Sequence, residues 1–333
     1  MTDRVAPFEA HRRRLFGLAY RMLGSASEAE DVVQDAYLRW HGTEPGGVRE
    51  PGGWLVRVVT NLCLNRLTAA RTTRERYVGP WLPEPVLTAD GALGPLETAE
   101  QHDSVSMALL VLLETLSPAE RAVFVLREAF GYSHRDTAEV LGYSEANTRQ
   151  VYARARRRVR AAPGAPAGQI ADPGALLDRF LAAARDGDLA GLEALLAADV
   201  GSWADGGGRA GLARRPVYGR SAVAHYLVGA AARFGAGIAL RPAQLNGVPG
   251  VLAYVDAARV ASAGSDRMAW LAGPGPAQEG TRVLVAAAVP EFWAGADGVP
   301  RVAALRIAGN PDKLAYAARQ AAALSHRGLL AGS

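Results

Sequence analysis

Apolar residues recur at intervals of three and four through residues 8–75, which is the spacing of amphipathic helices. The pattern predicts three helices there, with a capping box at Ser27–Glu30 opening the second. Beyond residue 174, two more amphipathic helices give way to short apolar runs bounded by glycine and proline. These runs predict strands at 238–240, 251–254, 268–271, 282–288 and 302–307. The order predicts a multidomain chain in which two all-α domains precede an α+β domain.

Residues 116–160 carry a helix-turn-helix pattern. Ser117-Pro118-Ala119-Glu120 is a capping box with proline at the first helical position, so a helix begins there. Ser133 begins a second short helix, Gly142 allows a tight turn, and Ser144 caps a third helix that ends in an arginine run. Two helices joined by a short turn containing glycine are typical of DNA-binding motifs. The alternative is a three-helix packing unit with a solvated basic end.

The third helix of this motif is polar where it begins and basic where it ends. In helix-turn-helix proteins the first residues of the recognition helix meet base edges, and basic side chains contact phosphates. An arginine suits guanine, and an amide suits adenine. The candidate −35 contacts are Asn147, Thr148, Arg149, Gln150, Arg154 and Arg157.

Two upstream segments resemble a known family. Asp31-Val32-Val33-Gln34-Asp35 and Trp54-Leu55-x-x-Val58-x-x-Asn61 resemble region 2 of the sigma-70 family, in its extracytoplasmic-function (ECF) branch, and residues 116–160 resemble region 4. The resemblance implies two partners: promoter DNA, and core RNA polymerase through the clamp helices of its largest subunit. It implies that Asp31, Gln34 and Asp35 bind polymerase, and that Trp54, Asn61, Asn65 and Arg66 contact the −10 element.

The chemistry of these residues fits such roles. An acidic and amide face suits a basic partner helix. An aromatic ring, amides and cations suit a melted strand with unstacked bases. The plainer alternatives are a solvated helix face at residues 31–35 and simple core packing of Trp54.

Three further motifs, together with the stretch Asn246 to Gly250, resemble a subgroup of ECF sigma factors, the SigJ-like group, which carries a C-terminal SnoaL-like domain. These motifs are Trp81-Leu82-Pro83-Glu84-Pro85, Asp205-Gly206-Gly207-Gly208-Arg209 and Asn310-Pro311-Asp312-Lys313-Leu314. The resemblance implies a cone-shaped α+β domain that regulates activity in place of a separate anti-sigma factor. We expect the three motifs to form an interdomain regulatory contact, with Arg209 near Glu84 as a charge partner.

The resulting division of the chain has five parts. We expect sigma region 2 at 1–76, a linker at 77–104, sigma region 4 at 105–162, a second linker at 163–173, and the SnoaL-like domain with its terminal helix at 174–333. Prolines and glycines prevent a long helix in both linkers.

Composition adds mainly exclusions. The formal net charge is only +4, and Lys313 is the single lysine, so the clustering of arginine is more informative than its amount. One cysteine, Cys63, excludes an internal disulfide and a cysteine-based zinc site. No apolar run approaches the roughly 20 residues of a membrane span. We therefore expect a cytoplasmic protein with no membrane partner, and the resemblance to sigma factors implies that it is not an enzyme and has no cofactor and no metal.

An alternative function remains open. The chain could be a helix-turn-helix regulator whose cone senses a small molecule or acts as an enzyme, since relatives of SnoaL include cyclases and isomerases that use an acid and a base. The candidates are Trp203, Asp205, His225, Tyr226 and Asp256, and no spacing forces two of them together. The sequence has no nucleophile elbow and no P-loop. An unknown ligand in the cone therefore stays a hypothesis.

Overall fold

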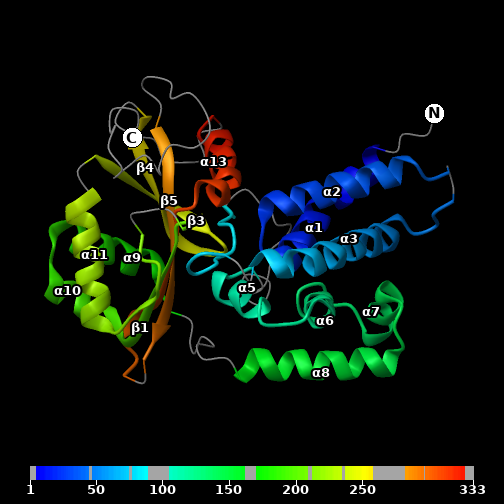
Figure 1. Cartoon of the computed structure of the whole chain (residues 1–333), viewed down its shortest axis with the longest axis horizontal. Helices are drawn as coiled ribbons and strands as arrows, with labels where there is room; N and C mark the ends of the chain where they lie inside the picture. The colour runs from blue at the N-terminus through cyan, green and yellow to red at the C-terminus, as the bar shows by residue number, and fades with distance from the viewer. Residues whose placement is uncertain are drawn as a thin grey trace. The chain divides into compact units, whose positions relative to one another are not determined.

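The chain folds as two units, which are described separately. The computed structural model describes residues 5–44, 47–74, 77–88, 105–161, 170–208, 212–234, 237–257, 282–295 and 297–326. One unit is helical and holds the region that resembles sigma regions 2 and 4. The other joins residues 77–88 to everything after residue 169 that the structure describes (Figure 1). The strand predicted at 268–271 lies outside the described residues.

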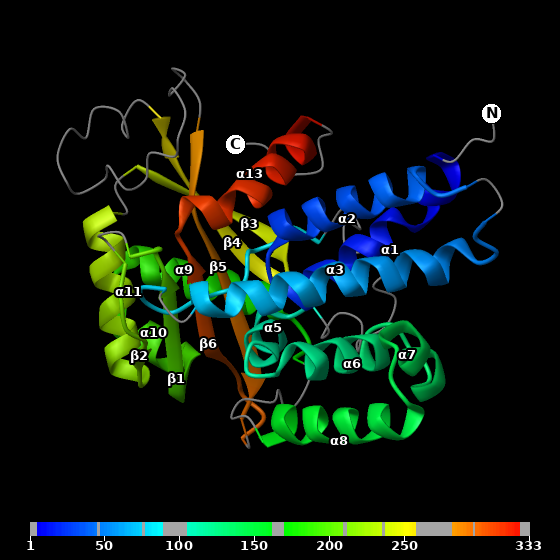
Figure 2. The same cartoon turned by 45° about the vertical axis from the view of Figure 1, so that its right-hand side comes forward.

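The first unit is built from amphipathic helices. They are α1 Val5–Leu23, α2 Ala26–His41, α3 Pro51–Arg74, α5 Met107–Leu113, α6 Pro118–Glu128, α7 His134–Leu141 and α8 Glu145–Ala161. Helices α1, α2 and α3 pack side by side, and α6, α7 and α8 form a second group (Figures 1 and 2). The boundary between α1 and α2 falls at Gly24, which has a positive φ of 68°. Ser25 rather than Ser27 caps α2, because its hydroxyl accepts a hydrogen bond from the Glu28 amide at 3.1 Å.

The capping boxes predicted from the sequence shape the second group of helices. Ser117 and Glu120 form the box that begins α6, with the Ser117 amide donating to Glu120 Oε2 at 3.0 Å. Ser133 and Asp136 form an equivalent box on α7. Gly142 ends α7 in the left-handed conformation, which a residue with a side chain adopts at a cost. The turn therefore redirects the chain into α8.

The second unit is centred on a six-stranded sheet. Its strands are β1 Leu196–Asp205, β2 Val217–Tyr218, β3 Ile238–Leu245, β4 Val248–Asp256, β5 Arg282–Ala294 and β6 Pro300–Ala308. The order is β2-β1-β6-β5-β4-β3, and every neighbouring pair is antiparallel except β1 with β6. The turn between β3 and β4 is Asn246–Gly247, where both residues have positive φ, as a two-residue hairpin requires.

Helices cover both faces of this sheet. Helices α9 Pro173–Asp186, α10 Leu189–Leu195 and α11 Arg220–Phe234 lie on one face, and α13 Pro311–His326 lies on the other (Figures 1 and 2). A buried apolar core that includes Leu176, Phe180, Leu192, Val223 and Leu305 joins α9, α10 and α11 to β1 and β6. Across the described part of the chain, no helix is both long and apolar enough to cross a membrane.

Candidate polymerase, DNA and regulatory sites

The predicted polymerase-binding residues lie on one face of α2. Asp31 and Gln34 are exposed, and Asp35 is half-exposed, whereas Val32, Val33 and Ala36 face the core. Leu38 extends the face by one turn and is 62% exposed, which is unusual for a leucine on a core-forming helix. The face therefore combines carboxylates, an amide and an apolar side chain.

Arg66, which the sequence assigned to −10 DNA, contacts this acidic face. Its Nη2 donates to Asp35 Oδ2 at 3.0 Å, and its Nη1 donates to the carbonyl oxygen of Glu28 at 2.9 Å. The Nη1 atom also lies 3.7 Å from Asp31 Oδ2. Arg66 thus joins α3 to α2 and holds two predicted polymerase-binding carboxylates.

The remaining predicted −10 residues lie along α3. Asn61 and Asn65 are exposed, and Arg57, which the sequence did not assign to the −10 element, is exposed four residues earlier, so the three form one stripe. Trp54 is half-buried, with its ring centroid 5.9 Å from that of Trp40. Trp54 therefore packs against α2 and keeps part of its surface accessible.

Helix α8 presents most, but not all, of the predicted −35 residues. Asn147, Arg149 and Gln150 are exposed on its first turns, and Arg149 forms an ion pair with Glu145 one turn earlier. Thr148 is fully buried, and its hydroxyl donates to the carbonyl oxygen of Ser144 at 3.1 Å. The sequence assigned Thr148 to the −35 contacts, but its side chain has no exposed surface available to a base in this structure.

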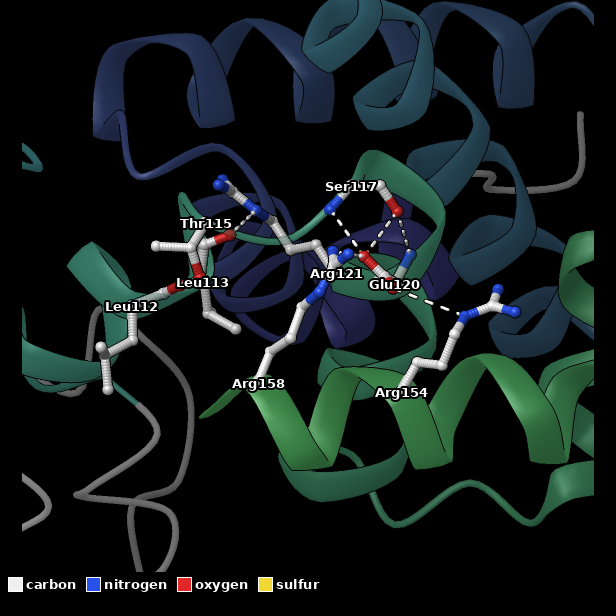
Figure 3. Close-up of polar contacts among 8 residues, drawn as sticks. All are labelled: Leu112, Leu113, Thr115, Ser117, Glu120, Arg121, Arg154 and Arg158. Atoms are coloured by element: carbon white, nitrogen blue, oxygen red, sulfur yellow. Dashed lines mark hydrogen bonds and ion pairs between the residues drawn. The ribbon is translucent and has the colours of Figure 1, made fainter. Parts of the chain in front are cut away.

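A buried carboxylate fixes α8 to the beginning of α6 (Figure 3). Glu120 is 4% exposed, and its carboxylate receives Arg158 Nη1 at 2.6 Å and Arg154 Nε at 3.6 Å. Burial alone would raise the pKa of Glu120, but the hydrogen bonds from Ser117 and the two guanidinium charges outweigh it, so the pKa lies below its ordinary value. Arg154, predicted to lie on phosphate, therefore also has an intramolecular partner, whereas Arg157 is exposed.

Arg121 is a structural residue that sequence analysis missed. It is 2% exposed, and its Nε donates to the carbonyl oxygen of Leu113 at 2.9 Å (Figure 3). Its Nη1 donates to the carbonyl oxygen of Met22 at 2.8 Å. A third contact joins Nη1 to Glu114 Oε1 at 2.8 Å. The available indication was its place beside Ala122 and Val125 on the apolar stripe of α6. Arg121 satisfies the carbonyl groups that end α1 and α5.

The second unit holds residues 77–88 against the sheet through the Asp205 carboxylate. Asp205 is 1% exposed and accepts four hydrogen bonds. The donors are the Tyr77 hydroxyl at 2.5 Å, Lys313 Nζ at 2.7 Å, the Leu82 amide at 2.9 Å and the Gly207 amide at 3.1 Å. Burial, and then the hydrogen bond to Asp205, raises the pKa of Tyr77, so its hydroxyl stays protonated as a donor.

Lys313 completes this cluster from the first turn of α13. Its ammonium lies 4.0 Å from the centroid of the Trp81 ring and 4.7 Å from that of Tyr77, within the range of cation–π attraction. It also donates to the carbonyl oxygen of Leu82 at 2.6 Å. Asn310 donates from Nδ2 to the Tyr77 hydroxyl at 3.0 Å and accepts from the Asp312 amide at 3.1 Å, which caps α13. The three motifs that the sequence singled out therefore meet.

The following residues extend the contact along the sheet edge. The Val86 amide donates to Asn246 Oδ1 at 3.1 Å, and the Asn246 amide donates to the Val86 carbonyl at 2.9 Å. Leu87 exchanges two hydrogen bonds with the Gln320 side chain, at 3.0 and 3.2 Å, and forms a bridge with Leu245. Sequence analysis missed Tyr77 and Gln320, which no local pattern distinguishes from ordinary surface polar residues.

The side chains of residues 82–87 are buried, as expected from their contacts along the sheet edge. Leu82, Pro83, Glu84, Pro85, Val86 and Leu87 are all buried. Gly207 has a positive φ of 63°, and a Cβ there would lie 2.7 Å from Asn310 Nδ2, so only glycine fits. A Cβ on Gly208 would lie 3.1 Å from Val78. Arg209, the predicted partner of Glu84, lies outside the described residues.

The residues considered as enzymatic candidates lie in different surroundings. Asp205 is occupied by the four donors above. His225 and Asp256 are exposed, and His225 Nδ1 lies 2.8 Å from the carbonyl oxygen of Ser221 in the preceding turn. Trp203 stacks edge-on with Tyr218 and lies 5.2 Å beneath the guanidinium of Arg306. Tyr226 lines an apolar cavity.

Comparison with known proteins finds two family matches within the first unit. The Sigma-70 region 2 family matches residues 7–73, and the Sigma-70 region 4 family matches residues 106–159. The chain is 39% identical over 262 residues to the ECF RNA polymerase sigma factor SigJ of Mycobacterium tuberculosis, covering 75% of this chain and 83% of that protein. It is 36% identical over 186 residues to a probable ECF sigma factor, SigI, of the same species, covering 55% of this chain and 63% of that protein.

The fold is also similar to a solved structure. The crystal structure of Mycobacterium tuberculosis SigJ aligns with a TM-score of 0.67 at 34% identity, covering 94% of this chain and 98% of that one. The likeness therefore extends through the α+β unit, beyond the two helical regions that the family matches cover.

Proposed function

The chain belongs to the ECF sigma factors of RNA polymerase. From that premise we propose which of its surfaces bind polymerase, which contact the −10 and −35 elements, and which regulate initiation. Sigma factor relatives are non-enzymatic transcription initiation factors that bind core polymerase and promoter DNA. In this chain the α2 face of Asp31, Gln34, Asp35 and Leu38 binds the clamp helices of the largest subunit. The support is its charge and its exposed leucine, because an acidic rim beside an apolar side chain suits a basic amphipathic partner.

Arg66 orients that face rather than reading DNA. A guanidinium held by two oxygens cannot also lie on a melted strand without giving up these bonds. The −10 strand is contacted by the stripe of Arg57, Asn61 and Asn65, with Trp54 at its beginning. Exposed amides can pair with unstacked bases, and an arginine can follow the backbone.

The −35 element is read by α8. Its exposed first turns carry Asn147, Arg149 and Gln150, which are the side-chain types that pair with guanine and adenine in the major groove. Arg157 contributes phosphate contacts and salt dependence. Glu120, through Arg154 and Arg158, sets the angle of α8 on α6.

The C-terminal unit regulates initiation by holding residues 77–88, in place of a separate anti-sigma factor. The observation that carries this proposal is the Asp205 cluster, in which one buried carboxylate binds Tyr77, Leu82 and Lys313. Tyr77 and Leu82 belong to the connection between α3 and α5, so docking restrains the path between regions 2 and 4. Because the domain is tethered, its effective concentration is on the order of millimolar, and even a weak contact stays formed.

Promoter-dependent transcription with purified core polymerase tests both proposals: that the chain directs initiation, and that its C-terminal unit regulates initiation. The full chain is expected to start transcripts that core enzyme alone does not start. Lys313→Met is expected to raise initiation, because it releases residues 77–88 while leaving regions 2 and 4 intact. If Lys313→Met leaves initiation unchanged, the Asp205 contact does not regulate it. If the variant lowers initiation, holding residues 77–88 does not restrain the sigma regions. Failure of the unaltered chain to bind core enzyme would contradict the α2 face.

The cone is not proposed to be catalytic. Asp205 is engaged by Tyr77, Leu82 and Lys313. Neither His225 nor Asp256 is among the described residues that line the cavity. A ligand role for that cavity is argued separately below.

A further inference from the structure

The second unit contains an apolar cavity of about 520 Å³. It lies between helices α9 and α11 and the face formed by β3, β4, β5 and β6, and its lining includes Phe180, Ala184, Leu227, Val251 and Leu305. The volume falls within the roughly 300–1,000 Å³ of small-molecule sites. The cavity belongs to this unit alone and does not involve the helical sigma regions.

The cavity is separate from the contact that holds residues 77–88. Ile307 lines it, and Ala204 is the cross-strand partner of Ile307. Asp205 is the next residue on β1, and successive side chains on a strand point to opposite faces. The Asp205 cluster and the cavity therefore occupy opposite faces of the same sheet.

The lining predicts the chemistry of an occupant. Apart from Arg185 and Tyr226, the described lining side chains are aliphatic, aromatic or glycine. The Tyr226 hydroxyl is hydrogen-bonded to the backbone of Ala213, and burial raises its pKa, so it supplies no charge. Arg185 supplies the only formal charge among the described lining residues, and it is exposed at the end of α9. Ordered water would need two to four polar partners, which these walls do not offer.

We propose that this cavity binds a small amphiphile with an elongated apolar body and one anionic group. The apolar body leaves water for the walls formed by α9, α11 and the sheet, which is favourable in proportion to the area buried. The anionic group lies at Arg185, where solvent also reaches it, so no unpaired charge is buried. The arrangement is suited to binding and not to reaction, because the lining supplies no carboxylate or imidazole.

Calorimetric titration of the full chain with three ten-carbon probes tests this assignment. The probes are decanoate, decan-1-ol and decylamine, which each have ten carbons and carry an anionic, a neutral and a cationic head group respectively. Decanoate is expected to bind saturably and about tenfold more tightly than decylamine, because the guanidinium attracts one and repels the other. In Arg185→Gln the affinity for decanoate should fall to within about threefold of that for decan-1-ol, whose own affinity should not change.

A matched pair on α9 locates the site. Ala184 lines the cavity, whereas Ala182 is exposed two residues earlier on the same helix. Ala184→Phe should weaken decanoate and decan-1-ol at least about fivefold by filling the space, and Ala182→Phe should leave both unchanged. Thermal unfolding of both variants confirms that each is folded.

Three results would overturn the proposal. Absence of saturable binding by all three probes would remove the site, and unchanged binding by a folded Ala184→Phe variant would place it elsewhere. An unchanged preference for decanoate in Arg185→Gln would remove the anionic group from the proposal. Since no polymerase or DNA is present, these failures are distinct from a failure of the proposed sigma regulation.

Discussion

Lys313 Nζ lies 2.7 Å from Asp205 Oδ2, in an ion pair whose carboxylate side chain has no exposed surface. Both partners also bind residues 77–88, through the Tyr77 hydroxyl, the Leu82 amide and the Leu82 carbonyl. The ion pair therefore binds both donor and acceptor groups of residues 77–88. Buried pairs of this kind are costly to break from one side, because the remaining charge is left without its partner.

Lys313→Met is expected to destabilise the second unit by roughly 3 kcal/mol, at the lower end for a broken buried pair because Asp205 keeps three other donors. Chemical denaturation measures the loss. Hydrogen exchange should also accelerate at the Leu82 amide, which Asp205 then holds less firmly. The matched control is Arg301→Met, which removes the exposed pair with Asp297 and should change little. Equal effects of the two changes would contradict a special role for Lys313.

Arg158→Met and Arg157→Met separate orientation of α8 from phosphate binding. Arg158 binds the buried Glu120, so its loss should lower thermal stability and weaken DNA affinity for all sequences alike. Arg157 is exposed, so its loss should leave stability unchanged and reduce the salt dependence of DNA binding by about one charge. Fluorescence anisotropy over a series of salt concentrations measures the slope. The same slope change in both variants would place Arg158 on phosphate as well.

Arg149→Ala is expected to relax discrimination at a single −35 base pair by about 1–3 kcal/mol, because a bidentate contact to a base edge is lost. Thr148→Val should leave base discrimination unchanged and cost about 1 kcal/mol of stability, because only its hydrogen bond to Ser144 is lost. Binding to a set of singly substituted −35 sequences measures both. Altered specificity in Thr148→Val would restore Thr148 as a base-reading residue.

Arg66→Met and Arg57→Met test whether α2 binds core polymerase and the exposed stripe of α3 contacts the −10 strand. Arg66 fixes the Asp35 carboxylate, so its replacement should weaken binding to core polymerase. Arg57 is exposed on the same helix, so its replacement should leave core binding intact and slow promoter opening. Binding to core enzyme and permanganate reactivity of the −10 strand are the two measurements. Normal core binding with slow opening in Arg66→Met would return Arg66 to the −10 site.

The pH dependence of stability should report on Glu120. Its pKa is below the ordinary value in the folded chain, so its carboxylate binds protons less readily there than in the unfolded chain. The associated stabilisation is therefore present above the ordinary carboxyl pKa, near 4.5, and is lost as the pH falls through the folded value. The stability difference between the unaltered chain and Glu120→Gln should be largest near neutral pH and shrink in acid. A difference that is independent of pH would contradict the ionised contact with Arg158.

Local patterns predicted the three N-terminal helices and the helix-turn-helix of the first unit, although the cap of α2 is Ser25 and helix α5 was not predicted. Capping boxes at Ser117 and Ser133 and the turn at Gly142 depend on neighbouring residues alone, so the local sequence indicates where α6 and α7 begin and where α7 ends. The same is true of the periodic burial that leaves Asp31, Asn61 and Arg149 exposed.

Only the tertiary structure decided which distant residues form hydrogen bonds and ion pairs, and where a cavity remains between the packed elements. Arg66 to Asp35, Arg158 to Glu120 and Asp205 to Tyr77 join residues 31, 38 and 128 positions apart, and no periodicity specifies such partners. The burial of Thr148 is different, because its spacing of three residues from the buried Val151 already places it on the inner face of α8. The cavity likewise arises because two helices and four strands leave space between them, which is a property of their packing and not of any one segment.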